Sequence, residues 1–182
     1  MSKGFGIFAQ NITKEGYECD YLRQAYALAL SIKIYCGKDQ KVFVMTDAEV
    51  PEKYKKVFDD IVSIPWGDMA ENSLWKIENR WKMYHMSPYD ETIVMDADCI
   101  VTRDITHWWD ILEGRSVCYA SEPVTYTGQS MTSNYYRKTF VANDLPMVYN
   151  TVHYFKKCDE AKAFYEMVEV IVNNWEEFYL RY

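Results

Sequence analysis

Short apolar segments alternate with longer amphipathic segments along most of the chain. The apolar segments have the length of β-strands and cover 5–9, 41–45, 61–64, 91–95, 116–120 and 147–155. Between them, apolar residues recur at the three-to-four-residue spacing of a helix, most clearly over 22–32 and 160–179. Strands that alternate with helices predict an α/β domain whose sheet is mostly parallel and flanked by helices.

Capping residues help to place the helices. We expect Asp20 to cap the helix over 22–32 and Asp104 to cap a further helix. Another helix is expected to begin at Ser73 and to end near Met86, because Pro88 disfavours helical backbone in the residue before it. The segment over 122–146 shows no clear period and is longer than most connections, which favours a functional flap or excursion.

The composition restricts the class of protein. With 182 residues, 49% hydrophobic and 16% aromatic, the chain is expected to form one ordered domain over 1–182. A net charge of −7 argues against general binding to nucleic acid or membrane surfaces. The cysteines are dispersed and no segment is long enough to span a membrane, so neither a disulfide framework nor a membrane span is expected and the cytoplasm is the expected location.

The clearest candidate chemistry follows the apolar segment over 91–95. Asp96 and Asp98 stand one residue apart, so an extended backbone presents both carboxylates on one side. Two anions held so close repel each other, and a hard divalent cation with oxygen ligands removes that conflict. The pair therefore predicts half of a metal site, and such a metal suggests phosphate chemistry.

Other polar residues are expected at the same edge of the sheet. In α/β folds, ligands bind beyond the carboxyl ends of the parallel strands. Gln10 and Asn11 follow the first predicted strand, and Asp47 follows the second. These residues are therefore expected to share one crevice with the aspartate pair, although a strand followed by Thr-Asp is also an ordinary turn.

An aspartyl phosphatase of the haloacid-dehalogenase type is an alternative interpretation. In that chemistry Asp96 would be the nucleophile and Asp98 the general acid/base. The nucleophile normally lies near the start of its domain, whereas several strand–helix units precede Asp96 here. No later acidic pair after a strand completes a magnesium site, so this alternative is the less favoured one.

The motifs, taken in order, resemble those of GT-A glycosyltransferases, most closely the glycogenin-like, family-8 type. The resemblance extends over 5–155 and includes the Phe-Ala-Gln-Asn segment over 8–11 and the Ser-Pro-Tyr segment that leads to Asp-x-Asp over 87–98. Asp104-Ile105 before the tryptophan pair and Tyr-Asn-Thr over 149–151 continue the series. The implied fold is a GT-A, Rossmann-like mixed sheet.

The resemblance also implies roles for individual residues. Asp98 would coordinate Mn²⁺ or Mg²⁺ directly, and Asp96 would contact both the metal and the ribose. The implied nucleotide-binding residues are Gln10, Asn11, Tyr21, Arg80 and Ala97, and the implied donor-sugar contact is Asn150. Lys76, one turn before Arg80, is equally compatible with an exposed charged face.

The implied activity is metal-dependent transfer of a sugar from a nucleoside diphosphate, with a UDP-sugar as the expected donor and an unknown hydroxyl as acceptor. Two positions depart from the family pattern. Val152 stands where a glycine is usual, and the family's histidine ligand from a C-terminal segment has no counterpart before Tyr182. We therefore expect a C-terminally truncated core, and a catalytically weak nucleotide-sugar binding module is the alternative. No general base is assigned.

Overall fold

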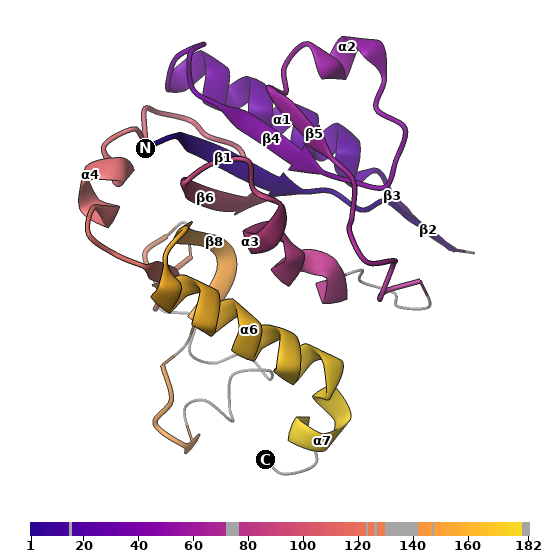
Figure 1. The fold of residues 1–182 in the computed structure, drawn as a ribbon. Helices are drawn as coiled ribbons and strands as arrows, with labels where there is room; N and C mark the ends of the chain where they lie inside the picture. Colours follow the sequence, from indigo (N-terminus) through magenta and orange to yellow (C-terminus); the bar gives the residue numbers. More distant parts are fainter. Residues whose placement is uncertain are drawn as a thin grey trace.

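The computed structural model describes residues 1–14, 16–71, 77–122, 124–125, 127–129, 142–146 and 148–179. Within these ranges, one sheet of six strands has the order β5-β4-β1-β6-β8-β7 (Figure 1). The strands are β1 (Lys3–Phe8), β4 (Val42–Met45), β5 (Asp60–Val62), β6 (Glu91–Asp96), β7 (Val117–Ser121) and β8 (Val148–Lys156). β5, β4, β1 and β6 pair in parallel with one another, whereas β8 is antiparallel to β6 and to β7. The predicted mostly parallel α/β sheet is confirmed.

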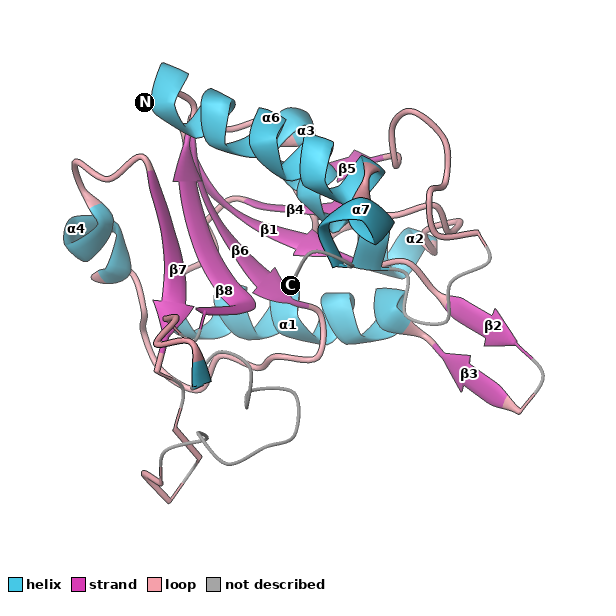
Figure 2. Ribbon diagram, turned by 90° about the horizontal axis from the view of Figure 1, so that it is seen from below, coloured by secondary structure: helices cyan, strands magenta, loops and turns pink. Residues whose placement is uncertain are grey.

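Helices cover both faces of the sheet, and Figure 2 shows α1 on one side and α6 on the other. The first face packs against α1 (Tyr21–Tyr35), α2 (Glu52–Lys55) and α4 (Trp108–Leu112). The second face packs against α3 (Met83–Met86) and α6 (Asp159–Asn173), and α7 (Trp175–Tyr179) follows. The central strands are apolar on both faces because both faces are covered; all four residues of β4 are buried, for example.

The predicted helix boundaries are partly correct. The Asp20 side chain accepts a hydrogen bond from the backbone N–H of Arg23 at 2.9 Å and caps α1 as expected. Asp104 does not cap α4, because it accepts the N–H of Thr106 at 2.8 Å and the helix begins only at Trp108. Asp104 therefore stabilises the turn that precedes α4.

Two local elements differ from the prediction. The helix expected over 73–86 is, in its described part, the 3₁₀ helix η1 (Ile77–Lys82) followed by the short α3; Ser73 and Lys76 lie outside the described residues. The sequence also gave no sign of the hairpin of β2 (Ile12–Lys14) and β3 (Tyr17–Cys19), which projects from the sheet in Figures 1 and 2. Strands of this length are too short to show an alternating pattern.

The predicted excursion over 122–146 lies mostly outside the described residues. Among the helices that the structure describes, none combines the length and apolar character needed to cross a membrane.

Candidate functional site

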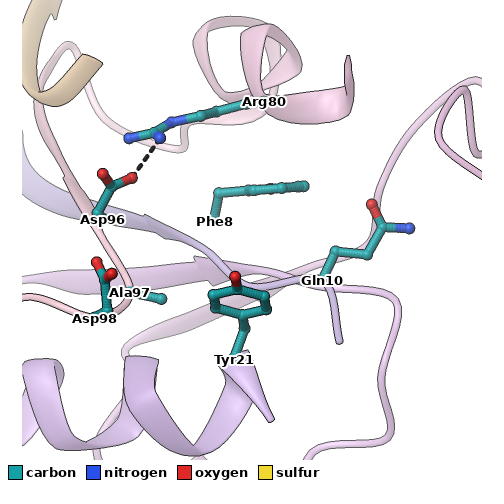
Figure 3. A pocket seen from close by; sticks show the side chains of 7 residues that line it. All are labelled: Phe8, Gln10, Tyr21, Arg80, Asp96, Ala97 and Asp98. Atoms are coloured by element: carbon teal, nitrogen blue, oxygen red, sulfur yellow. Dashed lines mark ion pairs between the residues drawn. The ribbon is translucent and has the colours of Figure 1, made fainter. Parts of the chain in front are cut away.

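The carboxyl ends of β1 and β6 border a pocket of about 260 Å³ (Figure 3). The residues that line it are Phe8, Gln10, Tyr21, Arg80, Asp96, Ala97 and Asp98. The pairing of the two strands explains why they meet, because Phe8 lies directly opposite Asp96 in the parallel register. Six of these seven residues are ones that the sequence singled out, so the predicted crevice exists at the expected edge of the sheet.

Asp96 and Asp98 lie one above the other on the same side of the pocket (Figure 3). Asp96 is the last residue of β6, and its backbone carbonyl accepts a hydrogen bond from the backbone N–H of Cys99 at 3.0 Å, which closes a turn. Ala97 between them is buried in the core under α1, which anchors the turn. As a result Asp98 is exposed while Asp96 is partly covered.

Arg80 reaches from η1 to the aspartate pair. Its guanidinium forms an ion pair with the Asp96 carboxylate and donates a hydrogen bond to the backbone carbonyl of Asn150 on β8. The two side chains are 14% and 28% exposed, so water screens the pair only partly. The guanidinium thus links β6 to β8 at the rim of the pocket.

The environment of Asp96 opposes its ionisation. Burial raises the pKa of this carboxyl above its ordinary value, and the charge of Asp98 raises it further. Arg80 and a hydrogen bond from Thr151 act in the opposite direction without cancelling the effect of burial. A carboxylate in this setting is stabilised by any additional positive charge in the pocket.

Tyr21 and Phe8 form the aromatic part of the lining. The Tyr21 hydroxyl points into the pocket from the first residue of α1 (Figure 3). Burial, with smaller contributions from Cys19 and Tyr17, raises the pKa of Tyr21 to about 12, so the phenol is neutral at pH 7. Sequence reasoning missed Phe8; its position at the end of the first strand, level with the first aspartate, is the signal that would have found it.

Gln10 is fixed by other side chains. It is 1% exposed; its amide nitrogen donates to the Asp47 carboxylate at 2.8 Å, and its amide oxygen accepts from Asn79 at 3.0 Å. Asn79 and Lys82, both fully buried, extend this network, since the Lys82 ammonium donates to the Asn79 side chain at 2.7 Å. Sequence reasoning did not identify either residue, because a charged helix face is usually exposed.

Asn11 and Asn150 do not line the pocket. The Asn11 side chain accepts the backbone N–H of Leu22 at 2.9 Å and so supports the start of α1. Asn150 is exposed and contributes its backbone carbonyl to Arg80. Their proposed contacts with nucleotide and sugar stay predictions.

The residues present suit a metal held by few protein ligands. Among the described residues, no three His, Cys, Asp or Glu side chains gather into a potential metal site. His153 is 4% exposed and stacks on Tyr119 at 5.0 Å, and burial lowers its pKa to about 3. Mg²⁺ is commonly bound by one or two carboxylates together with substrate phosphates, and the aspartate pair meets that requirement.

Comparison with known proteins supports the fold. No protein-family model matches the chain, and neither does any curated protein by sequence. The chain is similar in structure to the bifunctional glycosyltransferase WbbM, with a TM-score of 0.51, 16% identity, and coverage of 85% of this chain and 31% of that one. It is also similar to the glycosyltransferase GlyE of Streptococcus pneumoniae, with a TM-score of 0.54, 15% identity, and coverage of 94% and 39%.

A third similar structure is the mannosyltransferase Ktr4p of S. cerevisiae, with a TM-score of 0.51, 8% identity, and coverage of 93% of this chain and 61% of that one. The chain therefore spans less than two thirds of the length of each of these proteins. At such identities the likeness shows the fold, which is the GT-A-like fold of nucleotide-sugar transferases. The closer resemblance to the glycogenin-like family stays a prediction.

Proposed function

We propose that this chain is the donor-binding core of a metal-dependent glycosyltransferase that uses a nucleoside-diphosphate sugar, with a UDP-sugar as donor. One observation carries the proposal: Asp96, Asp98 and Arg80 meet in one pocket at the carboxyl edge of a parallel sheet. Two carboxylates and a guanidinium, with aromatic side chains beside them, match the needs of a metal, a diphosphate and a nucleoside. The GT-A-like fold supports the same conclusion.

Asp96 and Asp98 would hold Mn²⁺ or Mg²⁺. The bound cation supplies Lewis-acid stabilisation of the negative charge that grows on the departing nucleoside diphosphate. The exposed Asp98 carboxylate offers both of its oxygens, whereas Arg80 already occupies one side of Asp96. Asp98 is therefore the ligand on which metal binding depends most.

Arg80 would bind the diphosphate beside the metal. A guanidinium presents several N–H groups in one plane, which suits two phosphate oxygens at once. Its Nε is buried and has no hydrogen-bond partner among the described residues. Arg80 also donates a hydrogen bond to the Asn150 carbonyl, so a diphosphate bound to Arg80 would lie near the proposed donor-sugar residue.

The nucleoside would lie against Tyr21 and Phe8. The neutral Tyr21 hydroxyl can donate to a ribose oxygen or a base carbonyl, and the Phe8 ring offers an apolar wall. Gln10 would shape this end of the pocket, because Asp47 and Asn79 fix the orientation of its amide.

Isothermal titration calorimetry with UDP, with and without Mn²⁺, tests the proposal. We expect saturable binding that requires the metal and disappears with chelator, and a large loss of affinity in Asp98→Asn. Asp110→Asn, which changes an exposed aspartate of α4 outside the pocket, is the matched control. Equal UDP binding in the presence of chelator, or in Asp98→Asn, would contradict the proposed metal site.

A panel of UDP-sugars then separates transfer from binding alone. Sugar release or transfer supports the enzyme. Saturable binding without turnover supports the binding module, an alternative motivated by the two-carboxylate ligand set. Release of inorganic phosphate from a simple phosphate ester, lost in Asp96→Asn, would instead indicate the phosphatase.

A further inference from the structure

A second pocket adjoins η1 and has a different composition. Its volume is about 270 Å³, and it is lined by Trp66, Met69, Trp81, Lys82, Glu169 and Asn173. None of these residues lines the pocket with the aspartate pair. Indole rings together with a carboxylate and an amide form a surface that is apolar in one part and hydrogen-bonding in another.

Trp66 is held at the surface in a strained conformation. Its side chain is 64% exposed, and its backbone has φ of 57°, in the left-handed region that bulky residues rarely adopt. Such strain persists only where the surrounding structure imposes it, and it gathers at functional sites. A tryptophan that is exposed although its backbone is strained is a candidate ligand contact.

Buried polar groups impose this conformation. The Lys82 ammonium, fully buried, donates to the carbonyls of Pro65 at 2.9 Å and Gly67 at 2.7 Å, which flank Trp66 on either side. The backbone N–H of Met69 donates to the Asn79 side chain at 3.1 Å. Hydrogen bonds from Lys82 and to Asn79 thus fix the loop that carries Trp66 at several points. The fold therefore holds the indole in its exposed position.

The other residues of this pocket provide a second aromatic ring and polar groups. Trp66 stacks on Trp81 with ring centroids 5.9 Å apart and an interplanar angle of 22°. Trp81 is 8% exposed, and its indole N–H is buried without an acceptor among the described residues. A buried donor without an acceptor is costly. Glu169 and Asn173 lie one turn apart on α6 and offer further acceptors and donors.

We propose that this second pocket binds a carbohydrate ring, and that it is the site for a glycan acceptor. A pyranose has apolar C–H faces that pack on indole and a rim of hydroxyls that hydrogen-bond to carboxylate and amide groups. An organic cation would also suit aromatic rings and a carboxylate, but the positive charge of Lys82, buried behind this pocket, would repel it. The acceptor role rests on the proposed glycosyltransferase function, whereas carbohydrate binding does not.

The two pockets are joined through η1. Arg80 lines the first pocket, and the next two residues, Trp81 and Lys82, line the second. The Asn79 side chain bonds both Gln10 of the first pocket and Lys82 under the Trp66 loop. A glycan seated on Trp66 would therefore lie next to the element that contacts the donor diphosphate.

Saturation-transfer-difference NMR on the full chain, without nucleotide, tests the carbohydrate site. The probes are trisaccharides of glucose, mannose, galactose and N-acetylglucosamine at about 10 mM, which detects millimolar affinity, with tetramethylammonium as the cationic probe. We expect saturable binding of at least one trisaccharide and at least about tenfold weaker binding in Trp66→Ala. Trp66→Phe keeps an aromatic face and should lose less. Trp175→Ala removes a tryptophan of similar exposure, 59%, outside the pocket and is the matched control.

Glu169→Gln distinguishes the two ligand classes. It should change trisaccharide binding only a fewfold, because the amide oxygen still accepts a hydroxyl, whereas a cation would lose the charge that attracts it. Absence of trisaccharide binding, equal binding in Trp66→Ala and Trp175→Ala, or saturable binding of tetramethylammonium alone would overturn the proposal. Asp98→Asn should leave trisaccharide binding unchanged, so failure of the donor site and failure of this site are told apart.

Discussion

Replacing Arg80 with alanine should change metal binding and nucleotide binding in opposite directions. In the structure the guanidinium is paired with Asp96, which is one of the two proposed metal ligands. Without nucleotide, Arg80 should therefore compete with the metal for the Asp96 carboxylate. When a diphosphate is bound, Arg80 and the metal should both stabilise its negative charge. A residue that only stabilises the fold would produce no such reversal.

The magnitudes follow from the geometry. For an assumed separation of about 5 Å between the guanidinium and a divalent cation on the free side of Asp96, the repulsion is about 1–2 kcal/mol even with the full screening of bulk water. Arg80→Ala should therefore tighten binding of Mn²⁺ alone by roughly five- to thirtyfold. Loss of the charge-assisted hydrogen bonds to phosphate, about 1.5–3 kcal/mol, should weaken UDP binding at saturating Mn²⁺ by roughly ten- to a hundredfold.

Calorimetric titrations of Mn²⁺ alone, and of UDP in the presence of Mn²⁺, measure both effects. Arg115→Ala, which removes an exposed arginine outside the pocket, is the control, and thermal unfolding checks that each variant is folded. Arg80→Lys should give an intermediate loss for UDP, because one ammonium cannot replace the guanidinium fork. If folded Arg80→Ala binds UDP as tightly as the wild type, Arg80 does not contact the diphosphate. If it binds Mn²⁺ more weakly, the competition argued here is wrong.

Three further predictions concern the residues around the pockets. Tyr21→Phe should weaken UDP binding by roughly five- to tenfold through the loss of one hydrogen bond. Because the pKa of Tyr21 is about 12, its ionisation should not change the UDP affinity that calorimetry measures between neutral and mildly alkaline pH. Asn79→Leu should lower the free energy of unfolding by about 3 kcal/mol in urea denaturation, since Gln10 loses the hydrogen bond from Asn79 and the buried Lys82 ammonium loses one of its acceptors. A loss below about 1 kcal/mol would show that the network is not stabilising. Burial lowers the pKa of His153 from 6.5 to about 3, so between these pH values His153 is protonated in the unfolded chain and neutral in the folded chain. Stability contributed by His153 should therefore fall as the pH drops below 6.5, by up to about 1.4 kcal/mol per unit, until the pH reaches about 3. Urea denaturation at neutral and acidic pH should show a shallower decline in His153→Phe but not in the exposed-site control His107→Gln.

The sheet and the position of the pocket with the aspartate pair could be predicted from the sequence, because both depend on patterns that are local in the chain. The apolar segment before Asp96 and Asp98 identified a buried strand, and the α/β alternation placed its end at the edge where ligands bind. The resemblance to the GT-A family implied Arg80, and the structure brings this residue to Asp96. The candidate residues that the structure brings together here are thus those that one strand and one neighbouring helix position.

The rest depends on contacts between segments far apart in the sequence. The sequence pattern did not single out Asn79 and Lys82, which are both fully buried because α6 and the loop that carries Trp66 cover them. The Asn11 side chain supports the start of α1, a contact that the sequence pattern did not indicate. Whether a polar residue meets a ligand or another part of the protein is decided by tertiary packing, which periodicity does not report.

The 3₁₀ geometry of η1 explains how one short element serves two pockets. With three residues per turn, residues three apart lie on the same side, so Asn79 and Lys82 are stacked and their side chains meet at 2.7 Å. Arg80 and Trp81 then point about a third of a turn to either side of that line, Arg80 to Asp96 and Trp81 to Trp66. The α-helix predicted for this segment would offset Asn79 from Lys82 and weaken their contact. The tighter helix therefore links the first pocket to the second pocket, and Asn79→Leu should weaken ligand binding in both.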